Sequence, residues 1–268
     1  MIKTIVVGAA GRMGSRLISL IKDSTTLTLA GAVETAGHHA VGEDAGEKAG
    51  CGRLGVAITD QLAALLEEGE VVVDFSSPSS SLTNLAQVAK RKRAMVIGTT
   101  GFTSQETDDL KRLTQQVPCV FSPNMSVGVN VLFKTLAEIA KTLGEDYDIE
   151  VIEAHHRLKK DAPSGTAMKI AEVLARAMDR NLGQVGVYER HGMIGERTRN
   201  EIGIQTIRAG DIVGDHTVLF GGMGERIEVT HRAHNRDAFA GGALRAARWV
   251  VSKPPGLYDM LDVLGLRE

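Results

Sequence analysis

The first half of the chain alternates short apolar runs with segments of helical spacing. Continuous, largely β-branched runs lie at 2–7, 27–33, 71–75, 94–97 and 119–121, which is typical of strands buried on both faces of a parallel sheet. Apolar residues between them recur at helical spacing, as at Leu17, Ile18 and Ile21. Residues 36–50 are predicted to form a loop and 60–68 a helix. Such alternation predicts an α/β domain.

The second half follows a different pattern. A helix is predicted from a cap at Ser126 to Leu143, then a strand at 147–153 and a helix at 165–180. Four further strands are predicted at 185–189, 202–208, 213–221 and 227–233, with no helix between them. Consecutive strands predict a mixed or antiparallel sheet, with one face free to meet another subunit. A helix at 238–251 and a short apolar tail at 257–266 follow.

Composition and charge narrow the class of protein. A chain of 268 residues exceeds a usual single core, so two domains are expected. A net charge of −2 and a pI near 6.5 argue against nucleic acid as a main partner. The two cysteines, Cys51 and Cys119, form no disulfide framework and fit a reducing cytoplasm. No segment resembles a signal peptide or a membrane span, so we expect a soluble cytoplasmic protein.

A glycine-rich turn follows the first predicted strand and opens a helix, in the stretch Gly8-Ala9-Ala10-Gly11-Arg12-Met13-Gly14. This context favours dinucleotide binding, although the spacing is GxxGxxG and not the commoner GxGxxG. Gly8 would make the turn, Gly11 would let the backbone approach a pyrophosphate, and Gly14 would allow close helix–sheet packing. Arg12 could contact a phosphate. A plain tight turn between strand and helix is the alternative interpretation.

Other predicted strands also end in turns that could extend this site. Glu34 ends the second strand, twenty residues after Gly14, where an acidic side chain can bind the hydroxyls of an adenosine ribose. The turns Gly98-Thr99-Thr100-Gly101 and Ser122-Pro123-Asn124-Met125 consist mainly of small residues. Turns of this kind let a flat ring lie against the backbone, and they fall at the edge of the sheet where ligands bind.

A cationic cluster precedes the helix predicted at 165–180. Five basic side chains, His155, His156, Arg157, Lys159 and Lys160, lie within six positions, ahead of a Pro-Ser pair typical of a helix N-terminus. The amides of Gly165 and Thr166 would face an anion in front of that helix. The cluster therefore predicts a site for a small molecule with more than one carboxylate.

Two other interpretations of the cluster remain. It could be an ordinary solvated basic surface. It could also hold zinc, because His155 and Lys159 have the four-residue spacing of zinc-binding helices. However, Lys is a poor zinc ligand and no HExxH motif is present, so we expect no metal.

The stretch EAHHRLKKDAPSGTA at 153–167 closely resembles the E-(L/A)-H-H-x-x-K-x-D-x-P-S-G-T-A signature of the dihydrodipicolinate reductase family. The turns at 8–14, 98–101 and 122–129 and the stretch RAGDIVG at 208–214 resemble further signatures of that family. The resemblance implies a Rossmann-type parallel-sheet domain at 1–126, completed by 236–268, and a smaller α+β domain with a mixed sheet at 127–235. It also implies a homotetramer.

The implied activity is NAD(P)H-dependent reduction of 4-hydroxy-tetrahydrodipicolinate, a small cyclic dicarboxylate, to tetrahydrodipicolinate in lysine and diaminopimelate biosynthesis. Lys159 is then the candidate proton donor and His155 its acid–base partner, with His156, Lys160, Gly165 and Thr166 holding the substrate. The residues expected to bind NADH or NADPH are Gly8, Ala9, Ala10, Gly11, Arg12, Met13, Glu34, Gly98, Thr99, Thr100, Ser122, Pro123, Asn124 and Met125.

Position 35 departs from the family pattern. Many members have Arg after the acidic residue, where it can pair with the 2′-phosphate of NADPH, but this chain has Thr35. We therefore expect NADH to be used at least as well as NADPH. The alternatives are a related reductase of amino-dicarboxylates and a regulator that binds the nucleotide without turnover. The HHxxK cluster argues against a regulator, which needs no acid beside the hydride.

Overall fold

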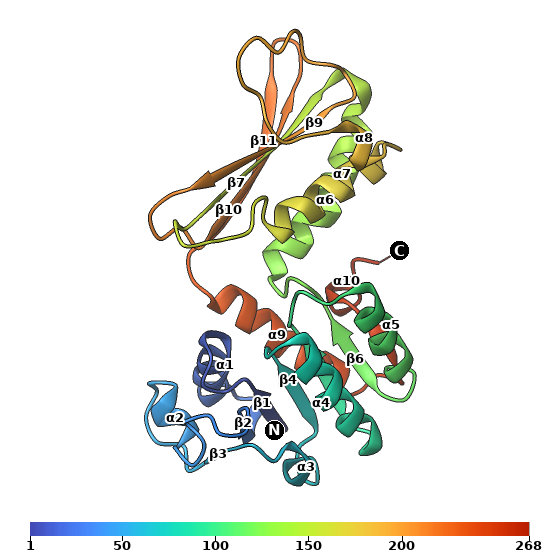
Figure 1. Cartoon of the computed structure of the whole chain (residues 1–268). Helices are drawn as coiled ribbons and strands as arrows, with labels where there is room; N and C mark the ends of the chain where they lie inside the picture. The colour runs from blue at the N-terminus through green and yellow to red at the C-terminus, as the bar shows by residue number, and fades with distance from the viewer. Residues whose placement is uncertain (268) are drawn as a thin grey trace. The chain divides into compact units, whose positions relative to one another are not determined.

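Seven parallel strands form the sheet of the first of two units in the computed structural model, which describes residues 1–267 (Figure 1). This unit comprises Met1–Val127 and the segment from Arg236 onward, and the second comprises Gly128–Asn235. The strand order is β12-β6-β5-β4-β1-β2-β3. The predicted buried runs are its centre, because β1, β4 and β5 have almost no exposed apolar side chain. The expected Rossmann-type parallel sheet is confirmed.

The elements of the first unit alternate along the chain as the periodicity predicts. In order they are β1 (Ile2–Val7), α1 (Arg12–Lys22), β2 (Leu27–Val33), α2 (Ala45–Lys48), β3 (Ile58–Thr59), α3 (Leu62–Leu65), β4 (Val71–Asp74), α4 (Pro78–Lys90), β5 (Ala94–Ile97), α5 (Ser104–Leu113), β6 (Pro118–Phe121), α9 (Asp237–Val250), β12 (Gly256–Tyr258) and α10 (Met260–Leu264).

Two details of the first unit differ from the sequence prediction. The presumed loop at 36–50 contains the short helix α2, because the Asp44 carboxylate caps it by accepting hydrogen bonds from the amides of Gly46 and Glu47. The helix predicted at 60–68 is only Leu62–Leu65, and its N-cap Gln61 makes no side-chain cap.

The carboxyl-terminal segment is not a simple apolar tail. Strand β12 pairs in parallel with β6, from Gly256 opposite Pro118 to Tyr258 opposite Val120, and extends the sheet. Helix α9 packs against α1, and Nε and Nη2 of Arg16 donate to the two Asp237 carboxylate oxygens, at 2.6 and 2.9 Å. Local periodicity in the sequence cannot predict contacts between residues so far apart in the chain.

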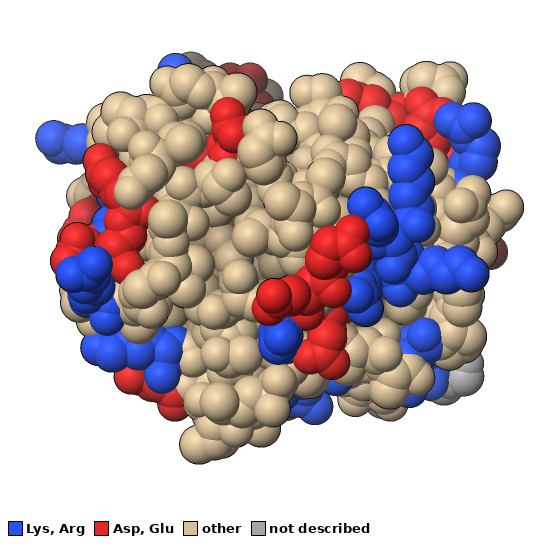
Figure 2. Space-filling view, turned by 90° about the horizontal axis from the view of Figure 1, so that it is seen from below, with Lys and Arg blue, Asp and Glu red and all other residues tan. Residues whose placement is uncertain are grey.

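Two features of the first unit have structural roles. Cys119 is fully buried in β6, and burial raises the pKa of its thiol. Two residues of the basic run at 90–93 have partners: Arg91 lies 2.8 Å from the Glu67 carboxylate, and Arg93 donates to the carbonyls of Leu66 and Glu67. Figure 2 shows, on the face it draws, basic side chains gathered beside acidic ones.

The second unit holds a five-stranded mixed sheet in the order β11-β10-β7-β9-β8, in which β7 is parallel to β9 and antiparallel to β10. This confirms the mixed sheet expected from consecutive strands. Its elements are α6 (Val127–Leu143), a 3-10 turn (Gly144–Asp146), β7 (Asp148–His155), α7 (Gly165–Ala177), α8 (Leu182–Val185), β8 (Gly186–Val187), β9 (Ile202–Arg208), β10 (Gly214–Gly221) and β11 (Arg226–Ala233). Residues 182–185 are therefore helical, and the strand predicted at 185–189 is shorter.

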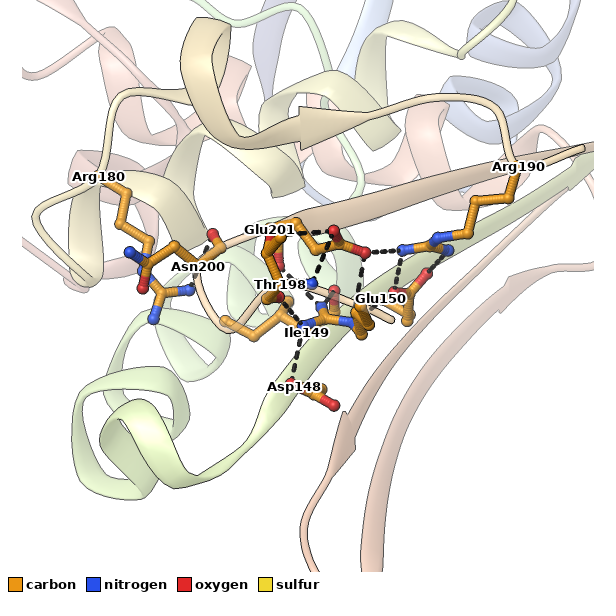
Figure 3. Close-up of polar contacts among 9 residues, drawn as sticks. Asp148, Ile149, Glu150, Arg180, Arg190, Thr198, Asn200 and Glu201 are labelled. Atoms are coloured by element: carbon orange, nitrogen blue, oxygen red, sulfur yellow. Dashed lines mark hydrogen bonds and ion pairs between the residues drawn. The ribbon is translucent and has the colours of Figure 1, made fainter. Parts of the chain in front are cut away.

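One face of this sheet packs against α6 and α7. Alternation places Ile149 and Val151 of β7 on that face, together with Val218 and Phe220 of β10, and all four are buried. The long segment between β8 and β9 belongs to the opposite face, where Arg190 donates to both Glu150 oxygens at 2.8 and 2.7 Å (Figure 3).

This charged cluster covers part of the face expected to be free. Arg197 donates to Asp148 at 2.7 Å. Arg190 also donates to Glu201 at 2.7 Å (Figure 3), so the segment is bonded both to β7 and to the residue before β9. A Cβ at Gly203 would come within 1.9 Å of Glu150 Oε2, so only Gly leaves room for this carboxylate.

Among the described residues, no helix is long and apolar enough to span a membrane.

Candidate active site

The glycine-rich turn has the geometry that its sequence predicts. Gly8 has φ of +75°, where a side chain is strained, and an added Cβ would also meet the Phe75 carbonyl at 3.1 Å. A Cβ at Gly14 would lie 2.1 Å from the Gly8 carbonyl oxygen, so this glycine allows α1 to pack against the turn. Gly11 is the N-cap of α1 and Arg12 is exposed at its start. These features fit a cradle for a phosphate at a helix N-terminus.

Glu34 lies against this turn. One oxygen of its carboxylate accepts the Ala10 amide at 2.9 Å and the other accepts the Thr35 amide at 3.1 Å. Each oxygen has a second lone pair, which leaves acceptor capacity for ribose hydroxyls. Glu34 therefore holds the turn in place as well as presenting charge beside it.

A pocket of about 300 Å³ opens at the carboxyl ends of β1, β2 and β4. It is lined by Val7, Gly8, Val33, Glu34, Thr35, Ala36, Asp60, Gln61, Leu62, Ala63, Ser76, Ser80, Thr83, Asn84 and Gln87. In the part of the chain that the structure describes, no Lys, Arg or His lines it. Its position and size fit an adenosine, and its charged side chains are acidic.

The two small-residue turns are more deeply built into the fold than the sequence suggested. Thr99 is buried and its hydroxyl bonds to that of Ser81 at 2.9 Å, while Ser122 is buried and donates to the Asn124 carbonyl. Met125 is a core side chain. Contact from these three residues to a ligand would therefore come from the main chain. Thr100 and Pro123 are exposed, and Gly98 has room only for hydrogen because the Phe75 ring lies beside it.

In the second unit, the cationic cluster begins at the end of a strand. His155 is the last residue of β7, and residues 156–164 form turns before α7. The amides of His156 and Arg157 donate to the carbonyls of Ile212 and Gly210, at 2.7 and 3.1 Å. The signature stretches at 153–167 and 208–214 thus bind each other. Because Lys159 is not helical, the spacing argument for zinc does not apply.

The predicted substrate residues lie in the turns before α7 and in its first turn. Lys159 is partly exposed and its ammonium lies 2.9 Å from the Asp161 carboxylate, whereas Lys160 is exposed. Gly165 is exposed, and an added Cβ there would meet nothing within 4 Å. Ser164 caps the helix by accepting the Ala167 amide at 3.1 Å. The helix therefore has a capped N-terminus with open space at Gly165, and the cations lie in the loop that leads into it.

Beneath this loop lies a buried carboxylate that the sequence prediction missed. Glu153 has no exposed surface. It accepts hydrogen bonds from His155 Nδ1 at 2.5 Å, from the Ser164 amide at 2.9 Å and from two Arg208 nitrogens at 2.8 Å each. Ser164 Oγ also lies 3.1 Å from Nε2 of the buried His216, whose ring makes an edge contact with His155.

The ionisation of these groups follows from burial and pairing. Burial by itself would raise the pKa of Glu153, but the hydrogen bonds from Arg208, His155 and Ser164 outweigh it and lower that pKa to about 2. Burial lowers the pKa of His155 more than Glu153 raises it. Burial also lowers the pKa of His216 to about 4, and the neighbouring His155 adds to this effect. Glu153 is thus an anion and His216 neutral near pH 7.

The sequence profiles of known families cover nearly the whole chain. The profile "Dihydrodipicolinate reductase, N-terminus" matches residues 2–125, and "Dihydrodipicolinate reductase, C-terminus" matches 128–264. This chain belongs to the dihydrodipicolinate reductase family.

Individual members of this family are similar over their full length. The chain is 57% identical to the 4-hydroxy-tetrahydrodipicolinate reductase of Geobacter metallireducens and 55% identical to that of Syntrophus aciditrophicus, each over 267 residues and all of both chains. A solved structure, dipicolinate-bound dihydrodipicolinate reductase from Paenisporosarcina sp. TG-14, has the same fold, with a TM-score of 0.75 and 22% identity over 98% of each chain.

The pattern of alternation in the sequence could have indicated the two buried residues of the site that were not predicted, Glu153 and His216. Alternation along β7 places Glu153 on the same face as Ile149 and Val151, and a charged residue on a buried face needs a partner. His216 stands in the same relation to Val218 on β10. The partner of Glu153, Arg208, begins the RAGDIVG stretch, but the parallel pairing of β7 with β9 that joins them is a tertiary feature.

Proposed function

We propose that this protein catalyses the NAD(P)H-dependent reduction of 4-hydroxy-tetrahydrodipicolinate to tetrahydrodipicolinate in lysine and diaminopimelate biosynthesis. The observation that carries the proposal is the loop at 155–166, where a buried carboxylate–imidazole pair, an ion-paired lysine and a capped helix N-terminus meet. Full-length identity above half with reductases of that name supports the same reaction.

The residues of the second unit account for the substrate class. The product of the preceding synthase carries two carboxylates, and cations beside a helix N-terminus are the groups that bind carboxylates. We assign this role to His156, Lys160 and the amides of Gly165 and Thr166. The open space before Gly165 would admit a carboxylate oxygen close to the backbone.

We assign the proton chemistry to Lys159 and His155. When bound, a reduced nicotinamide supplies the hydride. Reduction of a conjugated imine then requires a proton, which a positioned acid delivers in the transition state. Lys159 is our proton donor, and its pairing with Asp161 limits where this flexible side chain can lie. His155 is the acid–base partner.

The first unit supports binding of a pyridine nucleotide by the residues named from the sequence. Gly8, Gly11 and Gly14 have no side chain to keep a ligand from the backbone of the turn, and Glu34 lines the pocket at the ends of β1 and β2. We propose that NADH is used at least as well as NADPH, because the charged side chains lining this pocket are acidic.

We also propose a homotetramer that acts in the cytoplasm. The sheet face opposite α6 and α7 carries Ile207, which is 47% exposed, and the half-buried Ile152 and Leu219. An apolar strip beside the charged cluster fits burial against a second copy of the chain. The two free cysteines would stay reduced in the cytoplasm.

The activity is tested by following NADH and NADPH absorbance while the synthase and its substrates generate the dicarboxylate. Absorbance loss that needs both the synthase and this protein is the expected result. Loss of absorbance that is independent of the synthase, or none at all, would contradict the proposed reaction.

A further inference from the structure

We infer that Glu153 is a positioning residue of this reductase: its carboxylate holds His155 in the tautomer with hydrogen on Nδ1 and leaves Nε2 to exchange a proton with the substrate. The inference rests on the proposed function for its catalytic consequence. The tautomer itself is a property of the protein without substrate.

The hydrogen bond between the two side chains determines the tautomer. His155 Nδ1 lies 2.5 Å from Glu153 Oε2, and an ionised carboxylate can only accept a hydrogen bond. The hydrogen must therefore be on Nδ1 when the ring is neutral. The other nitrogen, Nε2, lies next to Gly214, where an added Cβ would come within 3.0 Å. Glycine at 214 thus keeps space beside the nitrogen that is left for chemistry.

Glu153 is itself held on several sides. Arg208 donates to both of its oxygens at 2.8 Å each, the Ser164 amide donates at 2.9 Å, and Thr206 Oγ1 lies at 3.4 Å. These donors come from β9 and from the N-cap of α7. Because the carboxylate is fully buried and so bonded, it cannot turn away from His155. The same group therefore orients the acid–base side chain and anchors the helix end proposed to bind substrate.

The charges around His155 predict how its protonation responds to Glu153. The groups facing it are Glu153 on its own strand, Arg208 on β9, His216 on β10 and Lys159 in the loop. Glu153 is the one of these that favours the imidazolium, whereas Arg208 and Lys159 disfavour it. Replacing Glu153 by a neutral residue must therefore lower the pKa of His155 and move its titration to lower pH.

The test uses Glu153→Gln, which keeps the side-chain shape and removes the charge. We expect kcat to fall by roughly 10²-fold, the scale of general acid–base catalysis, with a smaller change in KM for the dicarboxylate. The limb of the pH–rate profile that reports His155 should move to lower pH. Glu150→Gln is the matched control, because it removes an Arg-bonded carboxylate from the other face of the same strand. It should change stability and leave the pH profile in place.

Nitrogen-15 NMR of the histidine rings tests the inference without substrate and without a variant that must survive the loss of a buried charge. His155, assigned by comparison with His155→Gln, should be the Nδ1–H tautomer in the wild-type protein. If Glu153→Gln does not fold, Glu153→Asp retains the charge at a shorter reach and should retain the pH profile but lose kcat.

The outcomes separate the two proposals. An Nε2–H tautomer in the wild-type protein, or an active Glu153→Gln enzyme with an unmoved pH profile, would overturn the role of Glu153. A wild-type protein that shows the Nδ1–H tautomer but does not reduce the dicarboxylate would contradict the proposed function and leave the tautomer assignment standing.

Discussion

A single cation at position 35 should change which nucleotide the enzyme prefers. Thr35 is exposed at the rim of the pocket at the ends of β1, β2 and β4, next to Glu34. The 2′-phosphate of NADPH would bring negative charge toward Glu34 and Asp60, the charged side chains that line this pocket. Thr35→Arg would supply a forked donor suited to a phosphate.

The size of the effect follows from one favourable contribution and two that oppose it. A hydrogen bond to a charged group contributes about 1.5–3 kcal/mol. Ordering an arginine side chain costs up to about 2 kcal/mol, and in the free enzyme the new guanidinium can pair with Glu34, one residue away. We therefore expect a net change of about 1.4 kcal/mol, which is a tenfold shift in the ratio of kcat/KM toward NADPH.

Initial rates with each nucleotide at saturating dicarboxylate would measure this ratio. Thr35→Gln is the control, since it adds a long polar side chain without charge and should shift the ratio much less. Glu34→Gln should also favour NADPH, while its remaining carbonyl oxygen can still accept the Ala10 amide. A wild-type enzyme that prefers NADPH a hundredfold, or a Thr35→Arg variant with an unchanged ratio, would refute the reasoning and place the phosphate elsewhere, with Arg12 as the nearest candidate in sequence.

Three further predictions concern chemistry, stability and assembly. Lys159→Ala should lower kcat by roughly 10²–10⁴-fold with a smaller rise in KM, and His155→Ala should show a lesser loss of the same kind. If steady-state kinetics give a near-normal kcat for both variants, the cluster does not take part in the chemistry. The pKa of His216 is lowered from 6.5 to about 4 in the folded protein. As pH falls, the unfolded chain therefore binds this proton first, and roughly 3 kcal/mol of the free energy of unfolding present above pH 6.5 should be lost between pH 6.5 and 4. Denaturant unfolding of His216→Asn should show a flatter pH dependence than wild type or the exposed control His191→Asn. Light scattering at micromolar concentration should report a tetramer, and a particle of 28.6 kDa would show that the apolar strip on the second sheet is not an interface.

Much of the fold could be predicted because its signals are local. Continuous β-branched runs such as Ile2–Val7 and the glycine-rich turn after it predict a buried strand and a tight helix entry, and Gly14 has the close contact expected of it. The return of β12 to the sheet beside β6 could not be predicted from the residues, because a short run such as Gly256–Tyr258 has no period of its own. Its place depends on the edge that β6 offers.

The sequence predicted the site as a set of cationic side chains. The structure adds a buried carboxylate, Glu153, which is bonded to one of them, His155. Sequence reasoning selected the cations at 155–160 because they are unusual and lie before a helix start. It did not select Glu153, because a glutamate beside apolar residues looks ordinary until strand alternation assigns it to the buried face. At Thr99 and Met125 the sequence indicated only a turn whose backbone could face a ligand, and burial of both side chains in the core is a tertiary feature that it did not indicate.

The register of the second sheet shows that apolar cross-strand rows give way to a polar row beside the proposed active site. Two successive cross-strand rows on the face that packs against α6 and α7 are apolar, namely Ile202–Ile149–Phe220–Ile227 and Ile204–Val151–Val218–Val229. The next row is Thr206–Glu153–His216–His231. A third apolar row would be the more stable choice, since buried charges contribute little net stability even when paired. The change to polar residues occurs where α7 begins and the cationic loop leaves the sheet. The polar row is therefore best explained by the groups it orients, His155 and the N-cap of α7. A variant in which Glu153, His216 and Arg208 are all replaced by apolar residues should therefore unfold at no lower denaturant concentration than wild type, and its kcat should fall at least as far as that of Glu153→Gln.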